Sequence, residues 1–139
     1  MLNLIKDSIV FTLKTHFPSY EVYTEAVKQG METPCFFVFS LNPSIEPYPS
    51  GRYHRINPFT IQFVTDGDIR EQYDAIFPEL CSILEFIKVD GVMLQGMEMN
   101  MVSNDDSMSF FVQYDYFECR ENDDDYETME ELEYKKEEI

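Results

Sequence analysis

Residues 92–119, VMLQGMEMNMVSNDDSMSFFVQYDYFEC, have the pattern of a β-hairpin and constrain the class of fold more than any other segment. Apolar and polar residues alternate on both sides of a turn-forming run, Ser103 to Ser107, as they do in antiparallel strands with one buried face. Gly96 interrupts the first strand and predicts a β-bulge. The return strand, Met108 to Cys119, is expected to place four residues on one face: Phe110, Val112, Tyr114 and Tyr116.

Two other segments have the three-and-four spacing of an amphipathic helix. The apolar stripe of the first is Leu2, Ile5, Ile9, Leu13 and Phe17. Because Pro18 cannot continue a helix, this helix is expected to end near His16. The stripe of the second, which follows a turn at residues 66–68, is Ile69, Tyr73, Ile76, Phe77, Leu80, Leu84 and Ile87. Pro78 lies inside this second stripe and predicts a kink or a division.

Three strands are expected between the two helices. Residues 20–24 alternate, whereas residues 35–41, CFFVFSL, are apolar throughout and predict a strand buried on both faces. Residues 42–51, NPSIEPYPSG, are rich in Pro and Ser and predict a loop or a poorly paired turn. Residues 55–65 alternate again, and a break at Asn57-Pro58 predicts an edge strand or a bulge. The inward residues expected there are Ile56, Phe59, Ile61 and Phe63.

These elements predict an α+β fold, with a mixed, mostly antiparallel sheet and the two main helices on one face. The expected order is helix, three strands, helix, two strands. A chain of 139 residues has the length of one domain, which is expected at residues 1–120. Residues 121–139 are expected to form an acidic C-terminal tail. A short apolar stripe that includes Met129 and Leu132 predicts a helix at 127–138 that becomes ordered by docking on a neighbour.

The chain is strongly acidic, with 27 acidic and 10 basic residues and a net charge of −17. This balance argues against nonspecific binding of nucleic acid through a basic face. No apolar run approaches the roughly 20 residues of a membrane span. The N-terminus, MLNLIKDSIV, lacks a signal-peptide cleavage site, so a cytoplasmic protein is expected.

No pattern of catalytic, cofactor-binding or metal-binding residues is found. His16 and His54 have no partner at a triad or metal spacing, and the five glycines form no phosphate-binding loop. The acidic clusters match no calcium-loop spacing and are typical of turns and linkers. Cys35, Cys81 and Cys119 form no C-x-x-C pair and are expected to be buried small hydrophobes in a reducing compartment. We therefore expect no enzyme, no cofactor and no metal.

One cluster is unusual for so acidic a chain. Arg52, His54 and Arg55 lie within four positions, beside Tyr53, in a sequence with only ten lysines and arginines. A local positive spot on an acidic subunit is a natural docking point for the carboxylates of a neighbour. The alternative is a hairpin kept soluble by its charges, because surface ion pairs are common and weak. Both interpretations remain open from the sequence.

Several segments together resemble the phage tail terminator family, small tail-completion proteins of phages and prophages of Gram-positive bacteria. The resemblance covers residues 3–120, continues into the tail, and depends on the number and order of its segments. They are EVYTEAVKQGMETPCFFV (21–38), LNPS (41–44), RYHRINPFTIQF (52–63), EFIKVDGVMLQGMEM (85–99), FFVQYDYF (110–117) and MEELE (129–133).

This resemblance implies a structural protein of the virion tail, without catalysis or cofactor. Members form a hexameric ring on the head-proximal end of the tail tube, stop its polymerisation and present a surface to the connector proteins of the head. DNA passes through the lumen without specific binding, and an acidic wall would repel its phosphates. The family supplies no residue map, so the expected interface residues are our own inference: Arg52, Tyr53, His54, Arg55, Met129 and Leu132.

Three other functions remain as alternatives. A head–tail connector or neck protein would also form a ring, but on the head side. An acidic DNA-mimic inhibitor would carry carboxylates spread regularly over one face, whereas much of the charge here lies in the C-terminal tail. An unrecognised small enzyme is the third, and no motif favours it.

Overall fold

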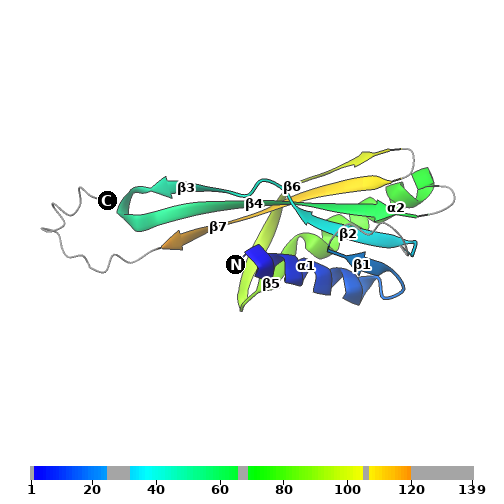
Figure 1. Cartoon of the computed structure of the whole chain (residues 1–139), viewed down its shortest axis with the longest axis horizontal. Helices are drawn as coiled ribbons and strands as arrows, with labels where there is room; N and C mark the ends of the chain where they lie inside the picture. The colour runs from blue at the N-terminus through cyan, green and yellow to red at the C-terminus, as the bar shows by residue number, and fades with distance from the viewer. Residues whose placement is uncertain (1, 25–31, 66–68, 105–106, 120–139) are drawn as a thin grey trace, which may run out of the picture. The chain divides into compact units, whose positions relative to one another are not determined.

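The structure, a computed structural model, describes residues 2–24, 32–65, 69–104 and 107–119. Its helices and strands follow one another along the chain as Figure 1 shows. They are α1 (Leu2–His16), β1 (Glu21–Tyr23), β2 (Cys35–Ser40), β3 (Ser44–Tyr48), a 3-10 turn η1 (Pro49–Gly51), β4 (Arg52–Val64), α2 (Ile69–Leu84), β5 (Phe86–Val89), β6 (Val92–Ser103) and β7 (Met108–Cys119).

The chain divides into two compact units. One, which we call the body, comprises Met1–Pro43 and Ile56–Asp115. The other comprises Ser44–Arg55 and Tyr116–Ile139, and we call its described residues, 44–55 and 116–119, the hairpin unit. The predicted helix at 127–138 lies outside the described residues and stays a prediction.

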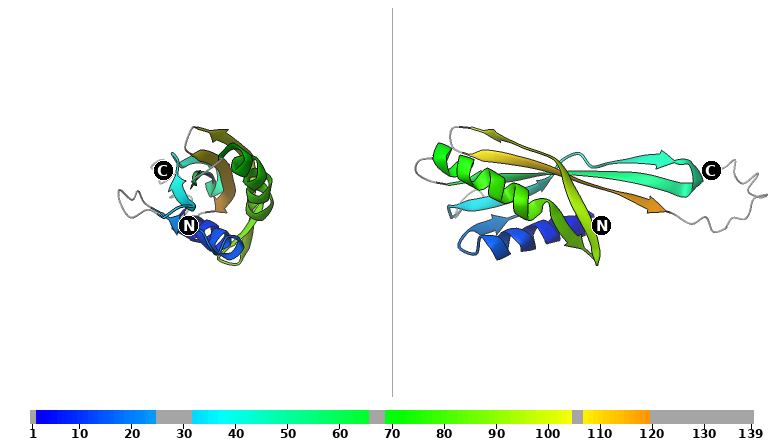
Figure 2. Two further views of the ribbon diagram at one scale, coloured as in Figure 1. Left: turned by 90° about the vertical axis from the view of Figure 1, so that its right-hand side faces the viewer. Right: turned by 180° about the vertical axis from the view of Figure 1, so that it is seen from behind.

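The sheet of the body confirms the expected α+β class. Its strand order is β1-β2-β4-β7-β6-β5. Only the short β1–β2 pair is parallel among the registers described, whereas β2–β4, β5–β6 and β6–β7 are antiparallel. The sheet is curled, and α1 and α2 lie on the same face of it (Figure 2). Among the described residues, neither helix is long and apolar enough to cross a membrane.

The helices bury most of the stripes that their spacing predicts, although Leu2 and Phe77 are only half-buried. In α1, Ile5, Ile9 and Leu13 are fully buried, and the helix ends at His16 as expected. In α2, Tyr73, Ile76, Leu80 and Leu84 are buried, and they pack against the sheet together with the α1 stripe. Each such side chain contributes roughly 1.5–3 kcal/mol by leaving water, so these two stripes account for much of the core.

The end of α2 differs from the prediction at two points. Pro78 does not divide the helix, which runs unbroken to Leu84. Pro78 has no N–H to donate to the Asp74 carbonyl one turn earlier, but both residues are exposed, so water can donate to that carbonyl instead. Ile87 does not extend the helical stripe, because it is buried in β5, a strand that the sequence analysis missed. Asp90 and Gly91, both with positive φ, form the tight turn between β5 and β6.

The expected loop at 42–51 is instead a strand and a turn. Residues 44–48 form β3, which pairs with β4, and residues 49–51 form η1. All five residues of β3 are exposed, and no described strand other than β4 pairs with it. A strand with one free side tolerates Pro47, because the missing N–H need not serve a second neighbour.

β4 lies between β2 and β7, so the expectation of an edge strand is wrong. Its proline is tolerated because β2 ends at Ser40, opposite Phe59, and Pro58 lies just beyond that last pair. The carbonyl of Pro58 still accepts a hydrogen bond from the Leu41 amide at 2.9 Å. The inward residue before it is Asn57 rather than Ile56. Asn57 is 4% exposed, and its Nδ2 donates to the Tyr114 carbonyl at 3.0 Å.

The β6–β7 hairpin confirms most of its prediction but not the bulge at Gly96. Phe110, Val112 and Tyr114 are buried on one face, as expected. The register shifts between Met97 and Asn100, where Glu98 has a φ of 56°, so the irregularity falls two residues later than predicted. This shift interrupts the expected alternation of apolar and polar residues along β6.

Gly96 serves a different purpose, a close approach between β6 and the end of α2. A Cβ atom there would lie 2.8 Å from the Leu84 carbonyl oxygen and 2.8 Å from Val112 Cγ2. The Gly96 amide donates to the Glu85 carbonyl at 2.6 Å. The Tyr114 hydroxyl donates to the same Leu84 carbonyl at 2.5 Å, and burial raises the pKa of that phenol well above its ordinary value.

The cysteines are only partly as expected. All three are free thiols. Cys35 is buried, and burial together with the nearby Glu21 carboxylate raises its pKa. Cys81 is half-buried, and Cys119, at the end of β7 in the hairpin unit, is exposed, so the prediction that all three are buried is wrong.

Candidate functional site

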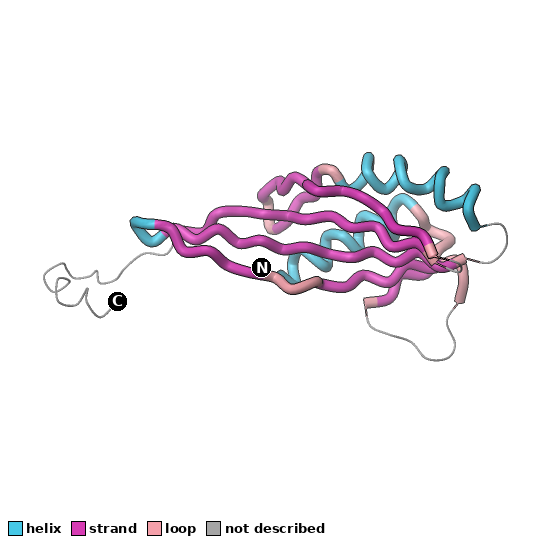
Figure 3. The backbone as a smooth tube through the Cα atoms, turned by 90° about the horizontal axis from the view of Figure 1, so that it is seen from above, coloured by secondary structure: helices cyan, strands magenta, loops and turns pink. Residues whose placement is uncertain are grey.

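The hairpin unit is built from β3, the η1 turn, the first residues of β4 and the last residues of β7. Figure 3 shows η1 as a short helical segment between two strands. Pro49 begins this turn, and Ser50 and Gly51 then adopt positive φ values of 68° and 72°, which reverse the chain. The turn therefore sets Arg52 at the start of β4, and the strand presents residues 52–55 alternately on its two faces.

One face of the hairpin unit carries an aromatic platform, which we define as Tyr48, Arg52, His54 and Phe117. Phe117 is its centre. The His54 ring stacks on Phe117 with centroids 4.8 Å apart and planes inclined by 20°. The guanidinium carbon of Arg52 lies 4.6 Å from the Phe117 centroid, a cation–π distance. Tyr48 meets Phe117 edge-on at 5.6 Å and His54 edge-on at 6.4 Å.

Two ion pairs accompany the platform within the same unit. His54 Nδ1 lies 3.6 Å from Glu46 Oε1, a pair that is charged only when the imidazole is protonated. On the other face, Arg55 Nε lies 3.6 Å from Glu118 Oε1. Pairs this exposed contribute about 0–1 kcal/mol each. Arg52 has no ion pair among the described residues, so its positive charge is available to a partner.

The hairpin unit has no core. None of its described residues is buried, and Phe117, Tyr48 and Ile45 are 49%, 42% and 40% exposed. A few strands without a buried face are only marginally stable in water, so such a unit gains stability from packing on something else. Tyrosine, arginine and other aromatic residues are also the types that dominate the binding energy of protein interfaces. The platform is therefore a candidate protein–protein contact.

The predicted site residues fall into two groups. Arg52, Tyr53, His54 and Arg55 are the first four residues of β4, and the structure brings Arg52 and His54 together on Phe117. Strand alternation places Tyr53 and Arg55 on the opposite face. Met129 and Leu132 lie outside the described residues.

Tyr48 and Phe117 are members of the site that the sequence did not identify. The composition of residues 42–51 predicts a loop around Tyr48, and the return strand that contains Phe117 carries no sequence signal of a site. The available signal was that Ile45, Tyr48 and Tyr53 surround a Pro-Ser-Gly turn, which is the composition of a hairpin. Within the described ranges, no group of three or more His, Cys, Asp or Glu side chains gathers that could hold a metal ion.

Comparisons with known proteins point to one family. A protein-family model described as "Phage tail terminator protein" matches residues 4–126. No curated protein matches the chain. Among solved structures, 26 chains match. One of them, whose name states no function, covers 86% of this chain and 96% of its own length, with 11% identity and a TM-score of 0.49. That likeness is too weak to add to the argument.

Proposed function

We propose that this chain, which belongs to the phage tail terminator protein family, is the ring-forming subunit that caps the head-proximal end of the tail tube. Family membership identifies a structural component of the phage tail that takes part in tail completion, and it favours a non-enzymatic role. Formation of a hexameric ring, arrest of tube polymerisation and joining of the head are the finer parts of the proposal. The subunit would assemble in the host cytoplasm.

The observation that carries the proposal is the hairpin unit without a core. A closed ring of identical subunits needs a heterologous interface, in which one patch meets a different patch on the next copy. The aromatic platform is suited to be one of these patches, because it combines exposed rings with the charge of Arg52, which forms no ion pair with another described residue. A basic patch on a chain of net charge −17 favours an acidic partner, and another copy is such a partner.

The remaining predicted residues extend the same interface. Tyr53 and Arg55, on the opposite face of β4, are proposed to contact the tail tube or the next subunit. The C-terminal tail, through Met129 and Leu132, is proposed to dock on a ring neighbour or an adjoining tail protein. The acidic character of the chain suits a lumen through which DNA slides without sticking, because a negative wall repels phosphates.

Deletion of the gene tests the biological role directly. Without a terminator, nothing caps the growing tube, so lysates should contain tails of uncontrolled length that do not join heads. Electron microscopy measures both properties in one preparation. Headless tails of normal length would contradict the proposal and favour a head–tail connector or neck protein.

Native mass spectrometry of the purified full chain tests the ring. The expected result is a closed oligomer, with six copies as the dominant species. The matched comparison is Phe117→Ala, which removes the centre of the platform from an exposed position and should shift the chain toward monomer. A wild-type chain that remains monomeric at all concentrations would contradict ring formation by this protein alone.

A further inference from the structure

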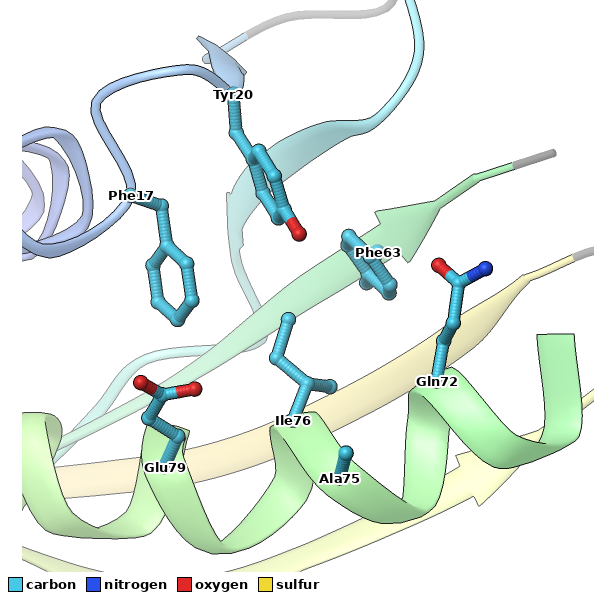
Figure 4. A pocket seen from close by; sticks show the side chains of 7 residues that line it. All are labelled: Phe17, Tyr20, Phe63, Gln72, Ala75, Ile76 and Glu79. Atoms are coloured by element: carbon cyan, nitrogen blue, oxygen red, sulfur yellow. The ribbon is translucent and has the colours of Figure 1, made fainter.

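A pocket opens on the body, between the connection from α1 to β1 and one side of α2 (Figure 4). Its volume is about 170 Å³. A cavity of roughly 150 Å³ holds a benzene molecule, so this pocket has room for one side chain rather than for a metabolite or a cofactor. Seven residues line it: Phe17, Tyr20, Phe63, Gln72, Ala75, Ile76 and Glu79.

The floor of the pocket is apolar and firmly packed. Phe17, Phe63 and Ile76 are 8%, 1% and 5% exposed. Tyr20 stacks on Phe17 at 5.3 Å and on Phe63 at 5.7 Å, with both pairs of rings within about 21° of parallel. The floor therefore exists before any ligand arrives, because its rings hold one another in place.

The rim of the pocket is polar, and one helix face supplies most of it. Gln72, Ala75 and Glu79 have the spacing of neighbours on one side of α2, beside Ile76 of the floor. The small side chain of Ala75 leaves the space open. Gln72 Oε1 already accepts a hydrogen bond from the Thr65 hydroxyl at 3.1 Å. Glu79 is exposed and has no ion pair among the described residues.

An aromatic floor with a carboxylate at its rim suits a long side chain with a cationic end. The methylene groups of lysine or arginine lie well on apolar surface while the charged group reaches a polar edge. A guanidinium also gains from the faces of aromatic rings, and it pairs with a carboxylate in a fixed geometry. The ligand class is therefore a single basic side chain presented by another protein.

We propose that this pocket is the receptor for Arg52 from the hairpin unit of a second copy of the chain. The proposal rests on the ring proposed above and names both of its contacting patches. A heterologous interface requires two different patches, and the platform and the pocket are different in sequence and opposite in charge. Arg55, the other arginine of the hairpin unit, is already paired with Glu118, whereas Arg52 has no ion pair among the described residues.

A charge-swap cycle on the full-length chain tests the proposal. Arg52→Glu and Glu79→Arg should each weaken self-association about tenfold or more, since close charge pairs across an interface couple by more than one factor of ten. The double variant, with both charges exchanged, should recover to within about threefold of wild type if the two side chains meet. Association constants from sedimentation velocity are the measurement, and native mass spectrometry reports the ring itself.

Two control variants at Asp74 separate the pocket from general effects of charge and bulk. Asp74→Arg makes the same charge change on an exposed position of α2 that does not line the pocket, so it should leave association within about threefold of wild type. Ala75→Tyr fills the pocket without altering charge and should weaken association, whereas Asp74→Tyr should not. Thermal unfolding of each variant confirms that the body remains folded.

The outcomes distinguish this inference from the proposed function. If wild type forms rings but Glu79→Arg and Ala75→Tyr do so equally well, the pocket proposal is wrong and the ring stands. If both single variants weaken association, and the double variant loses as much association free energy as the two single variants together, Arg52 is not the occupant of the pocket. That result would overturn the proposal. If wild type never assembles, the ring fails and the pocket proposal fails with it.

Discussion

Replacing Gly96 by alanine should destabilise the body by more than the usual cost of substituting a glycine. The added methyl group would lie 2.8 Å from the Leu84 carbonyl oxygen and 2.8 Å from Val112 Cγ2. The first of these is a backbone atom and cannot rotate away. Overpacking of a core costs about 1–3 kcal/mol. Displacing the Leu84 carbonyl also strains the hydrogen bond from the Tyr114 hydroxyl, which contributes about 0.5–1.5 kcal/mol.

Together these effects predict a loss of about 2–4 kcal/mol, a large share of the roughly 5–15 kcal/mol that stabilises a domain. Urea unfolding followed by circular dichroism measures the change in unfolding free energy. The matched control is Gly91→Ala, where a Cβ meets nothing within 4 Å and only a φ of +81° opposes the change. That control should cost about 1 kcal/mol, the usual penalty for a left-handed residue that is not glycine. If Gly96→Ala costs no more than Gly91→Ala, the close approach is not what selects glycine at this position.

Three further predictions follow from other parts of the molecule. Phe117→Ala should change the unfolding free energy of the body by less than about 0.5 kcal/mol, because Phe117 is half exposed. The same substitution should lower self-association, and unchanged association would show that the platform is not part of the interface. Tyr114 has a raised pKa in the folded state, so its contribution to stability should be constant below the ordinary phenol pKa of about 10 and should decline as the pH rises above it. The loss of stability at high pH should therefore be less steep in Tyr114→Phe, and equal slopes in urea titrations would contradict this. Truncation after Arg120 should leave a folded subunit that assembles poorly. Hydrogen exchange in the assembled particle should show protected amides at 127–138, and exchange at unstructured rates would return this segment to a solvated tail.

The helices and the β6–β7 hairpin could be predicted because burial imposes a period on their residues. The α1 stripe repeats at three and four positions until Pro18, and Phe110, Val112 and Tyr114 repeat at two. No comparable period identifies β5. Ile87 follows Leu84 by three positions and therefore continues the helical stripe, although the chain has already changed to a strand. Ile87 belongs to a strand rather than to the helix because this segment pairs with β6, and that pairing is a tertiary interaction.

The candidate site was predictable only as a charge cluster. The composition of the chain made Arg52 and His54 conspicuous, but the ring on which both rest, Phe117, is more than 60 residues away in the sequence. Tyr48 was not identified because the three prolines and two serines of residues 42–51 indicate a loop. Exposed strands such as β3 lack the alternation that burial produces, so their sequences carry little signal of the structure they adopt.

The absence of burial in the hairpin unit also bears on how such a protein can diverge. Substitutions at exposed positions usually change the folding free energy by less than about 0.5 kcal/mol. Residues 44–55 can therefore vary without lowering the stability of the body. A subunit organised in this way can adapt its contact surface to a changing partner through single mutations, each of which leaves a foldable chain. Partner recognition and folding stability then evolve as nearly independent traits, because the residues that would recognise a partner contribute almost nothing to folding stability.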